Sequence, residues 1–493
     1  MRSHSAKASG HATRLTTLAA TFIGAFALRM AVPMLWPGIH YPDEIMQSLE
    51  QAHRLVFGNG LVPWEFRDGA RSWLLPALLA APMWLGDALA PETGAYRLLA
   101  QALVAALSAS TVVIGLLWAR KHGIRHAVLA AVVLCTWFEL VYFGARALGE
   151  VVASAFLFTG VYLCAEREPR SPRHDVLAGV YLAGAFVFRF HLAPALALAA
   201  VWRCRAEFRA RWVPMLVGAA IPLLALGIAD GLAWSEPFGS IVNNFRANIL
   251  QERSHVYGTS GTGWYVMHVF ERWRYALPAI VPLALWGARR EPLPLLVAVT
   301  VVLAHSAIAH KEYRFIYPAL LLIVFCASLG TAELLRWFQQ RPAGSTTSRG
   351  ALFVACAAWL ALSLTLAAAP TMRPEWSRGR AGVELMARAG RDARCGVGLL
   401  GAWSWTGGYS SLHGNLPLYL LDWDRDRWNT QAFDAWILPQ GVPDPRPAGY
   451  RLVQCAVQGA AGVEALCLWI RSGGCNPTGA TNEAQHVLEA TGQ

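Results

Sequence analysis

The sequence predicts an all-α polytopic membrane protein with about eleven transmembrane helices, followed by a small C-terminal α/β domain. Three observations predict this class. The 493 residues are 55% hydrophobic and only 15% charged, whereas soluble domains carry about 25% charged residues. The mean hydropathy is +0.36. Apolar runs of about 17–25 residues recur along the chain, which is the length that a helix needs to cross a bilayer.

The net charge of +11 comes largely from arginines in short loops between the apolar runs. Such loops favour the cytoplasmic side of a membrane, so we interpret the charge as a topology signal and expect no nucleic-acid partner. Basic residues within the first fourteen positions predict a cytoplasmic N-terminus, and Arg120, Arg205 and Arg290 are expected on the same side. The three lysines against 39 arginines indicate a GC-rich, bacterial genome.

Spans are predicted at 16–36, 97–118, 126–144, 148–164, 175–188, 192–203, 213–229, 276–288, 293–309, 315–332 and 351–369. The first is predicted to stay uncleaved, because it is too long for a signal peptide and lacks a small-residue cleavage site. The apolar run 73–89 is predicted to lie in the outer interface. Counting it as a span would place the basic loop 120–122 outside.

These spans divide the chain into two predicted domains. Residues 1–369 form the membrane domain, with a first outer loop at 37–96 and a long outer loop at 230–275. Residues 370–493 form the C-terminal domain, which is expected on the outer, extracytoplasmic face.

The tail differs in character from the membrane part. Its apolar runs "CGVGLL" at 395–400 and "YRLVQCAV" at 450–457 are typical of strands. Four cysteines lie in the tail, an even number in a compartment that permits disulfides, so at least one disulfide is expected. Cys467 and Cys475 are the nearest pair in sequence.

Charged and polar side chains gather at the outer ends of the predicted spans. Asp43 and Glu44 open a helix after the first span, where Pro42 and first-turn acids suit a helix start. Charges that converge at one membrane face are costly unless they are paired or functional. The candidate residues are Asp43, Glu44, Trp64, Glu65, Arg71, Arg146, Tyr257, Trp264, Tyr265, His310, Lys311 and Arg314.

A carboxylate that faces cationic side chains at a membrane surface suits sugar transfer from a lipid-phosphate donor. The cations stabilise the departing phosphate, and the carboxylate takes the proton from the acceptor hydroxyl. We predict Asp43 as this base, with the adjacent Glu44 as its rival, because successive helical residues point about 100° apart. Donor-phosphate ligands are predicted at Arg71, His310, Lys311 and Arg314. The sequence contains no Walker motif, which disfavours a nucleotide-sugar donor.

Over roughly residues 15–335 the chain resembles the family 22 glycosyltransferases, which have the GT-C membrane fold and include mannosyltransferases of GPI-anchor and N-glycan assembly. The matching segments are "PDEIMQSLEQAH" (42–53), "WEF" with "RS" (64–72), "RALGE" (146–150), "YGTSGTGWY" (257–265) and "HKEYRF" (310–315). The resemblance implies inverting transfer of mannose from a polyprenyl- or dolichyl-phosphate mannose, without a metal or other cofactor, and Asp43 as the base. The same segments imply substrate contacts from Trp64, Glu65, Arg146, Tyr257, Trp264 and Tyr265.

Two alternatives remain open at this point. One is transfer of another sugar, such as arabinose or aminoarabinose, from a polyprenyl phosphate. The other is a non-enzymatic transporter of lipid-linked sugars, which predicts charges deep inside spans and an inverted repeat. The expected partners are the lipid-phosphate sugar, a glycan or glycolipid acceptor and the membrane. The expected location is the bacterial inner membrane, or the ER membrane in a eukaryote, with the active site on the extracytoplasmic face.

Overall fold

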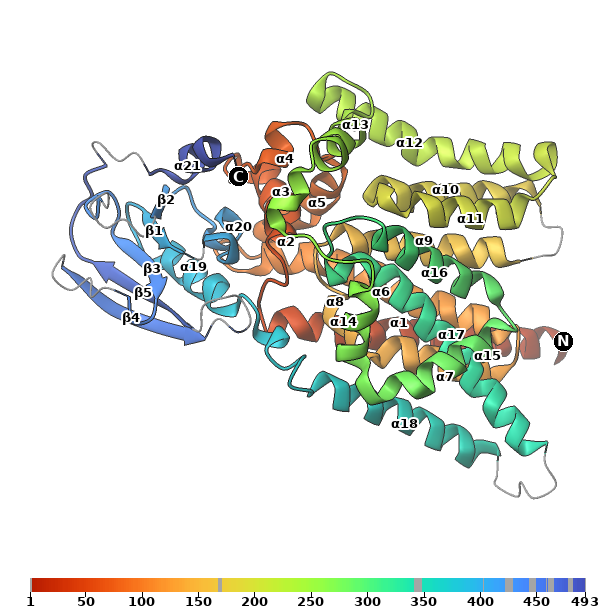
Figure 1. Ribbon diagram of the computed structural model, residues 1–493. Helices are drawn as coiled ribbons and strands as arrows, with labels where there is room; N and C mark the ends of the chain where they lie inside the picture. Colours follow the sequence, from red (N-terminus) through yellow and green to blue (C-terminus); the bar gives the residue numbers. More distant parts are fainter. Residues whose placement is uncertain are drawn as a thin grey trace.

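The computed structural model shows a bundle of long helices joined to a C-terminal sheet domain (Figure 1). The structure describes residues 2–492 except 167–170, 341–347, 402, 422–428, 443–448, 458, 460–464 and 478–481. The N-terminus lies at the end of the bundle that is remote from the sheet domain. The predicted combination of an all-α membrane part with a C-terminal sheet domain is therefore confirmed.

The bundle contains α1 (Arg2–Leu35), α6 (Ala95–Arg120), α7 (Ile124–Thr136), α8 (Phe138–Phe143), α9 (Gly149–Ala165), α10 (Pro172–Phe188), α11 (Ala193–Cys204), α12 (Val213–Trp234), α15 (Leu277–Ala288), α16 (Pro292–Ser306), α17 (Tyr317–Gln339) and α18 (Ser348–Ala367). Every predicted span falls on these helices. The span predicted at 126–144 is divided into α7 and α8, because Trp137 has an extended backbone. Among the described residues, five helical segments are long and apolar enough to cross a membrane.

The two loops that were predicted to be outer loops form short helices at the end of the bundle next to the sheet domain (Figure 1). The first loop contains α2 (Pro42–Glu44), η1 (Ile45–Leu49), α3 (Glu50–Phe57), α4 (Trp64–Arg67) and α5 (Leu74–Leu89). The long loop contains α13 (Gly239–Phe245), η4 (Arg246–Leu250), η5 (Arg253–Tyr257) and α14 (Trp264–Trp273), and η2 (Phe190–Leu192) and η7 (Tyr313–Ile316) join membrane helices. These elements carry most of the candidate residues.

Glycines allow some membrane helices to approach at backbone distance. A Cβ atom on Gly287 of α15 would lie 1.9 Å from the carbonyl oxygen of Cys326 in α17. A Cβ atom on Gly330 of α17 would lie 1.8 Å from the carbonyl oxygen of Leu283 in α15. Close packing of small residues replaces the hydrophobic driving force that helices lack inside lipid.

The C-terminal domain is built on one mixed sheet. Its strands are β1 (Val397–Leu400), β2 (Leu418–Leu421), β3 (Ala435–Pro439), β4 (Tyr450–Val457) and β5 (Ala465–Arg471), in the order β2-β1-β3-β5-β4. β1 is parallel to β2 and β3, and β5 is antiparallel to β3 and β4. Helices η8 (Glu375–Ser377), α19 (Arg380–Asp392), η9 (Trp403–Trp405), α20 (Tyr409–Leu412) and α21 (Ala484–Thr491) complete the domain. Both predicted strand segments are observed, as β1 and β4.

Two disulfides stabilise this sheet. Cys455 on β4 pairs with Cys467, its direct partner on β5, and Cys395 pairs with Cys475. The expectation of at least one disulfide is confirmed, but the nearest-pair choice of Cys467 with Cys475 is wrong. Antiparallel pairing of β4 and β5 brings Cys467 opposite Cys455, and separation along the chain does not reveal which strands are neighbours.

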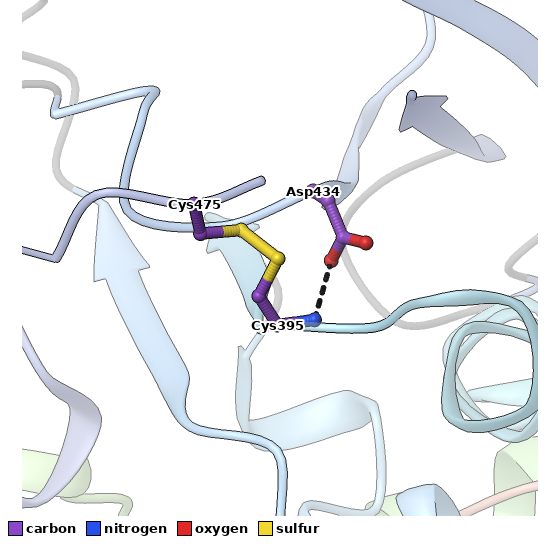
Figure 2. Close-up of side chains that lie close together, drawn as sticks. All are labelled: Cys395, Asp434 and Cys475. Carbon is purple, nitrogen blue, oxygen red and sulfur yellow. Dashed lines mark hydrogen bonds between the residues drawn. A yellow bond between two sulfur atoms is a disulfide. The ribbon is translucent and has the colours of Figure 1, made fainter. Parts of the chain in front are cut away.

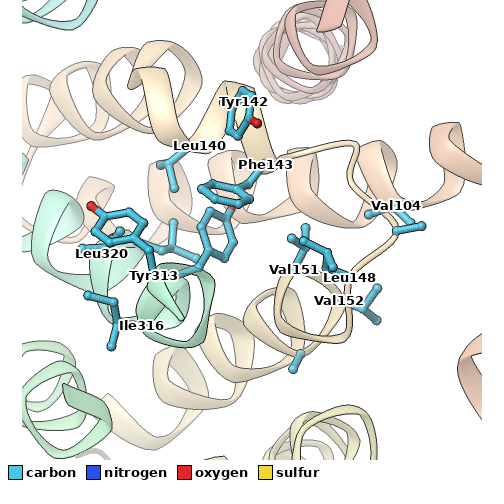
Figure 3. Packing of buried hydrophobic residues seen from close by; sticks show 14 of the residues in the cluster. Val104, Leu140, Tyr142, Phe143, Leu148, Val151, Val152, Tyr313, Ile316 and Leu320 are labelled. Carbon is cyan, nitrogen blue, oxygen red and sulfur yellow. The ribbon is translucent and has the colours of Figure 1, made fainter. Parts of the chain in front are cut away.

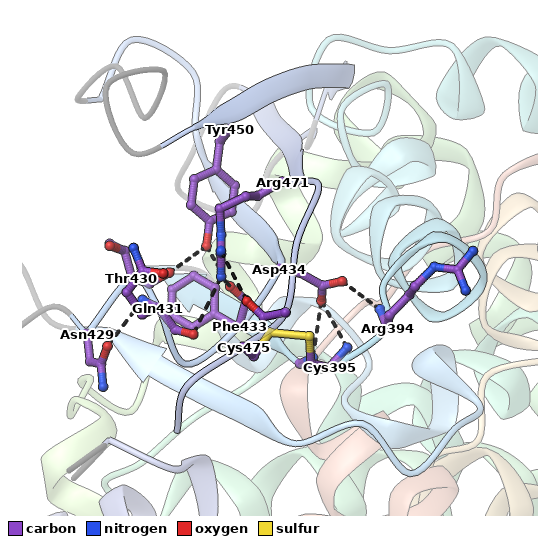
Figure 4. Close-up of a disulfide and its surroundings, with 12 residues drawn as sticks. Arg394, Cys395, Asn429, Thr430, Gln431, Phe433, Asp434, Tyr450, Arg471 and Cys475 are labelled. Atoms are coloured by element: carbon purple, nitrogen blue, oxygen red, sulfur yellow. Dashed lines mark hydrogen bonds between the residues drawn. A yellow bond between two sulfur atoms is a disulfide. The ribbon is translucent and has the colours of Figure 1, made fainter. Parts of the chain in front are cut away.

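Asp434 organises the backbone beside the Cys395–Cys475 disulfide. Its carboxylate accepts hydrogen bonds from the backbone N–H groups of Arg394, Cys395 and Gly396 at 2.8, 3.1 and 3.2 Å, as Figures 2 and 4 show in part. The two sulfur atoms and a carboxylate oxygen lie within 4.8 Å of one another. The disulfide and the backbone hydrogen bonds account for this cluster of cysteine and carboxylate groups.

Replacing Cys395 and Cys475 together by Ala should destabilise the C-terminal domain more than replacing Cys455 and Cys467. The first bond joins residues 80 positions apart and the second joins residues 12 apart. In the chain-entropy model the two losses are about 4.5 and about 3 kcal/mol. Thermal unfolding of the purified double variants measures the difference, and peptide mapping without reduction checks the pairing. Equal stability of both double variants and the wild type would contradict the assignment.

Candidate active site

Asp43 lies in the first turn of α2, shortly after the C-terminal end of the first membrane helix. Tyr41 is the N-cap residue, Pro42 occupies the first helical position, and Glu44 follows Asp43. The fixed φ of proline suits a helix start, and the first turn favours acidic side chains. The chain continues into η1 and α3 without a break, so the backbone of Asp43 is fixed at the start of a longer helical segment.

Arg314 joins Asp43 to two further carboxylates. Its Nη2 donates to Asp43 Oδ2 at 2.5 Å, its Nη1 lies 3.3 Å from Glu150 Oε1, and its Nε donates to Glu312. The Arg314 residue is only 2% exposed. Burial alone would raise the pKa of the Asp43 carboxyl, but the charges of Arg314 and Arg71 outweigh burial and hold the pKa below its ordinary value. Asp43 is therefore ionised at neutral pH.

Apolar packing beneath this ion-pair cluster fixes its side chains. Tyr313 lies beside Arg314 in the sequence and points into a buried cluster formed by α6, α8, α9 and α17 (Figure 3). Leu148 and Val151, on either side of Glu150, belong to the same cluster. Close-packed interiors tolerate little movement, so Arg314 and Glu150 are held in place by their neighbours.

A buried carboxylate, Glu139, anchors Tyr313 in turn. It accepts hydrogen bonds from the hydroxyl of Tyr313 at 2.5 Å and from the indole N–H groups of Trp273 and Trp137 at 2.8 and 3.1 Å. Satisfied buried polar networks add rigidity. Glu139 thereby connects α8, α14 and η7 directly behind the ion-pair cluster.

Two cavities meet at Asp43. The larger has a volume of about 480 Å³ and lies among the outer loops, η2, the end of α16 and η9. The smaller, of about 70 Å³, lies between α5, the ends of α9 and α10, and α13. Five residues line both cavities: Asp43, Gln47, Arg71, Arg189 and Arg314.

Arg71 and Arg189 have hydrogen-bonding capacity that the described residues do not use. Among the described residues, the Nε atoms of both are buried without a hydrogen-bond partner. Arg189 Nη2 lies 3.1 Å from Glu150 Oε1, and its guanidinium stacks 4.6 Å from the ring of Phe315. Arg71 is held through its backbone carbonyl, which accepts a hydrogen bond from the indole of Trp234 at 3.2 Å. Unsatisfied guanidinium groups that line a cavity suit binding of an anion.

Four of the other predicted residues also line the larger cavity: Trp64, Glu65, Tyr257 and His310. The indole of Trp64 donates to the hydroxyl of Tyr257 at 3.1 Å, which joins the first outer loop to the long one. Burial, with the nearby charge of Asp43, raises the pKa of Glu65. Burial lowers the pKa of His310, but its hydrogen bond with Glu312 outweighs burial and leaves the pKa above the ordinary value.

Glu44 and Arg146 lie together, but outside both cavities. Glu44 accepts a hydrogen bond from the backbone N–H of His40 at 3.1 Å, and Arg146 Nη1 approaches its carboxylate at 3.4 Å. Arg146 also donates to the carbonyl oxygen of Gly38 at 2.7 Å. This pair ties α2 to the start of α9, which leaves Asp43 as the carboxylate of the two that faces the cavities.

Lys311, Trp264 and Tyr265 also lie outside the two cavities. The Lys311 ammonium donates to the carbonyl oxygen of Ser260 at 3.0 Å and to that of Ile308, so it stabilises the loop. Trp264 stacks on His268 with ring centroids 3.7 Å apart, and Tyr265 is fully buried. The structure thus places these three residues outside the two cavities, where they make contacts within the protein.

Four further residues line a cavity but are not among the site residues predicted from the sequence: Arg189, Glu150, Trp403 and Ser404. Glu150 lies within the "RALGE" segment, and Arg189 is a charged residue at the outer end of a predicted span. These positions in the sequence could have identified both residues as candidates for the site. Trp403 and Ser404 carry no such signal, because they lie in the C-terminal domain, far along the chain from the membrane part.

The fold is that of a membrane glycosyltransferase of the GT-C class. The crystal structure of ArnT from Cupriavidus metallidurans bound to undecaprenyl phosphate superposes with a TM-score of 0.59 and 12% sequence identity, covering 92% of this chain and 98% of that chain. The same protein in its apo state gives a TM-score of 0.57 and covers 94% of this chain. At this level of identity the similarity establishes the fold.

The chain belongs to the Alg9-like mannosyltransferase family, whose model matches residues 20–374. This finding confirms the resemblance predicted from the sequence. GPI mannosyltransferase 3 of Yarrowia lipolytica is 30% identical over 327 residues, which cover 59% of this chain and 58% of the relative. GPI alpha-1,2-mannosyltransferase 3 of Danio rerio is 28% identical over 320 residues, which cover 60% of this chain and 56% of the relative. The chain thus matches less than two thirds of the length of these relatives.

Proposed function

We propose that this protein transfers mannose from a polyprenyl- or dolichyl-phosphate mannose to a hydroxyl group of a glycan or glycolipid, with inversion at the anomeric carbon. One observation carries the proposal. At the junction of two cavities, an ionised Asp43 meets Arg71 and Arg189, whose Nε atoms have no partner within the described chain. Membership of the Alg9-like family supports mannose as the transferred sugar.

In this proposal Arg71 and Arg189 bind the phosphate of the donor. Charge-assisted hydrogen bonds from guanidinium groups to phosphate are among the strongest in proteins. As the bond between the anomeric carbon and the phosphate oxygen breaks, negative charge grows on the departing lipid phosphate. Fixed cations in a partly enclosed site stabilise that charge without reorganisation.

Asp43 acts on the acceptor. Its carboxylate takes the proton of the acceptor hydroxyl while the hydroxyl oxygen forms the new bond to the anomeric carbon and the lipid phosphate leaves. Arg314 holds Asp43 ionised and oriented, since it is itself fixed by Glu150 and Glu312. A single displacement of this kind inverts the configuration of the transferred sugar.

The disulfides support an extracytoplasmic position for this reaction. Disulfides persist outside the cytosol, in the periplasm, the ER lumen or the extracellular space. The domain that contains Cys395–Cys475 and Cys455–Cys467 also contributes Trp403 and Ser404 to the larger cavity. We therefore propose that donor and acceptor meet on the extracytoplasmic face.

Reconstitution tests the proposed function. Purified protein in liposomes should consume polyprenyl-phosphate mannose and release polyprenyl phosphate when a mannoside acceptor is supplied. NMR of the product should show the anomeric configuration opposite to that of the donor. Use of a polyprenyl-phosphate pentose with no use of the mannose donor would contradict the proposal, as would a product with retained configuration.

A further inference from the structure

The larger cavity is lined by residues from two different parts of the protein. His191 in η2 and His305 at the end of α16 come from the membrane helices. Trp403 and Ser404 in η9 come from the C-terminal domain. The cavity therefore extends from the membrane part to the C-terminal domain, and Asp43 lines it as well.

The segment that carries Trp403 is held firmly against the first outer loop. Glu50 is fully buried and accepts hydrogen bonds from the backbone N–H groups of Tyr409 and Ser410 at 3.0 and 2.8 Å. Gly408 has a φ of +54°, and a Cβ atom there would lie 2.7 Å from Glu50 Oε1, so only glycine fits without rearrangement. The turn that follows Trp403 is thus locked to α3.

Further contacts from the membrane domain hold the same turn. Arg97 donates to the hydroxyl of Ser411 at 2.7 Å, and Asp87 lies 2.8 Å from the Nε2 atom of His413. Asn59 donates to the carbonyl oxygen of Gly414 at 2.8 Å. Buried and half-buried polar contacts of this density fix one arrangement of two domains. Trp403 is therefore a preset part of the cavity wall.

We propose that Trp403 binds a sugar ring of the acceptor glycan, so that the C-terminal domain selects the acceptor. This inference rests on the proposed function. A lipid-phosphate donor keeps its tail in the bilayer, so it occupies the part of the cavity next to the membrane helices, with its phosphate at Arg71 and Arg189. The remaining part, next to Trp403, is available for the acceptor.

The chemistry of this end of the cavity suits a carbohydrate. Binding sites are typically lined by aromatic side chains with a few placed polar groups that fix orientation. Trp403 provides a large flat apolar surface, on which the C–H face of a pyranose packs. Ser404, Glu65 and Asn248 line the same cavity and provide hydrogen-bonding partners for sugar hydroxyl groups.

Steady-state kinetics with polyprenyl-phosphate mannose and the octyl glycoside of a mannose disaccharide test this inference. Trp403→Ala should raise the KM for the disaccharide about tenfold or more, and leave the KM for the donor within about twofold, because only acceptor binding is lost. Trp403→Phe keeps an aromatic ring and should restore most of the acceptor affinity. The full-length protein is used in all cases.

Trp405→Ala is the matched control. Trp405 lies in the same short helix, but it does not line the cavity and contacts Arg378, with 5.8 Å between the guanidinium and the ring centroid. This variant should keep the wild-type KM for the disaccharide. The inference is overturned if Trp403→Ala has a wild-type acceptor KM, or if it changes the donor KM by the same factor. A wild-type protein that consumes no mannosyl donor would instead refute the proposed function, whatever the variants do.

Discussion

Asp43→Asn should lower the turnover number by about 10²–10⁴-fold, the usual contribution of a general base. Asparagine keeps the shape of the side chain and can still accept a hydrogen bond from Arg314, but it cannot take the proton of the acceptor hydroxyl. Binding of the donor should persist, since Arg71 and Arg189 are unchanged. Single-turnover transfer from a radiolabelled polyprenyl-phosphate mannose measures the rate, and equilibrium binding of the same donor measures affinity.

Asp392→Asn is the control for this substitution. Asp392 is half-buried at the end of α19, forms an ion pair with Arg388 and lines neither cavity. Its rate should match the wild type. An Asp43→Asn protein with a wild-type rate would refute the assignment. An inactive, correctly folded Glu44→Gln protein beside it would move the base by one residue.

The pH dependence of the wild type provides a second check on Asp43. The base acts only when ionised, and Arg314 with Arg71 holds the pKa of its carboxyl below the ordinary value, which is about 3.9. Its contribution is therefore present above that pKa and is lost as the pH falls through it. The rate should stay level from pH 8 down to about pH 5. An acid limb above pH 5 that disappears in Asp43→Asn would contradict a lowered pKa.

The sequence predicted the helices and the meeting of distant segments, because both follow from the membrane. Each predicted span falls on a helix, since an apolar run of this length has few other stable forms in a bilayer. Asp43 and Arg314 are 271 residues apart, yet their side chains form an ion pair. The positions of the basic loops predicted that both residues lie on the same side of the membrane. Residues at the same end of a compact helix bundle are close in space even when they are far apart in the sequence.

The direction of individual side chains was beyond the reach of the sequence. Lys311 and Arg314 lie in one short segment, but only Arg314 reaches Asp43, because the turn into η7 directs Lys311 toward backbone carbonyls. In the same way, Glu44 turns toward Arg146 while its neighbour Asp43 lines the cavities. A difference of one residue rotates a side chain by about 100° on a helix, and no pattern in the sequence fixes the starting angle.

The contacts between the membrane domain and the C-terminal domain could not be predicted from the sequence either. Glu50 accepts a hydrogen bond from the backbone N–H of Tyr409, which is 359 residues away. No sequence motif around either residue predicts this contact. Trp403 reaches the cavity only because this turn is locked to α3. The composition of the tail indicated strands, but the packing of the sheet domain on the outer loops depends on tertiary contacts that composition does not encode.

Arg71→Gln should weaken the binding of the donor far more than Lys311→Gln does. Arg71 lines both cavities, its Nε has no partner among the described residues, and its charge acts on Asp43. Losing a hydrogen bond to a charged phosphate removes about 1.5–3 kcal/mol, which corresponds to a rise of about 10–150-fold in the dissociation constant of the donor. Glutamine is close to arginine in polarity but carries no charge, so the change isolates the electrostatic contact.

Lys311→Gln is the matched comparison, since it removes the same charge at a residue that was also predicted to bind the phosphate. Its ammonium donates to the carbonyl oxygens of Ser260 and Ile308 rather than lining a cavity, so donor affinity should stay within about twofold of the wild type. Titration of each protein with polyprenyl-phosphate mannose, and with polyprenyl phosphate alone, measures the effect. Arg71→Gln should lower the affinity for both ligands by the same factor, because both contain the phosphate. If Lys311→Gln lost more donor affinity than Arg71→Gln, the phosphate would have to be assigned to Lys311 instead of Arg71.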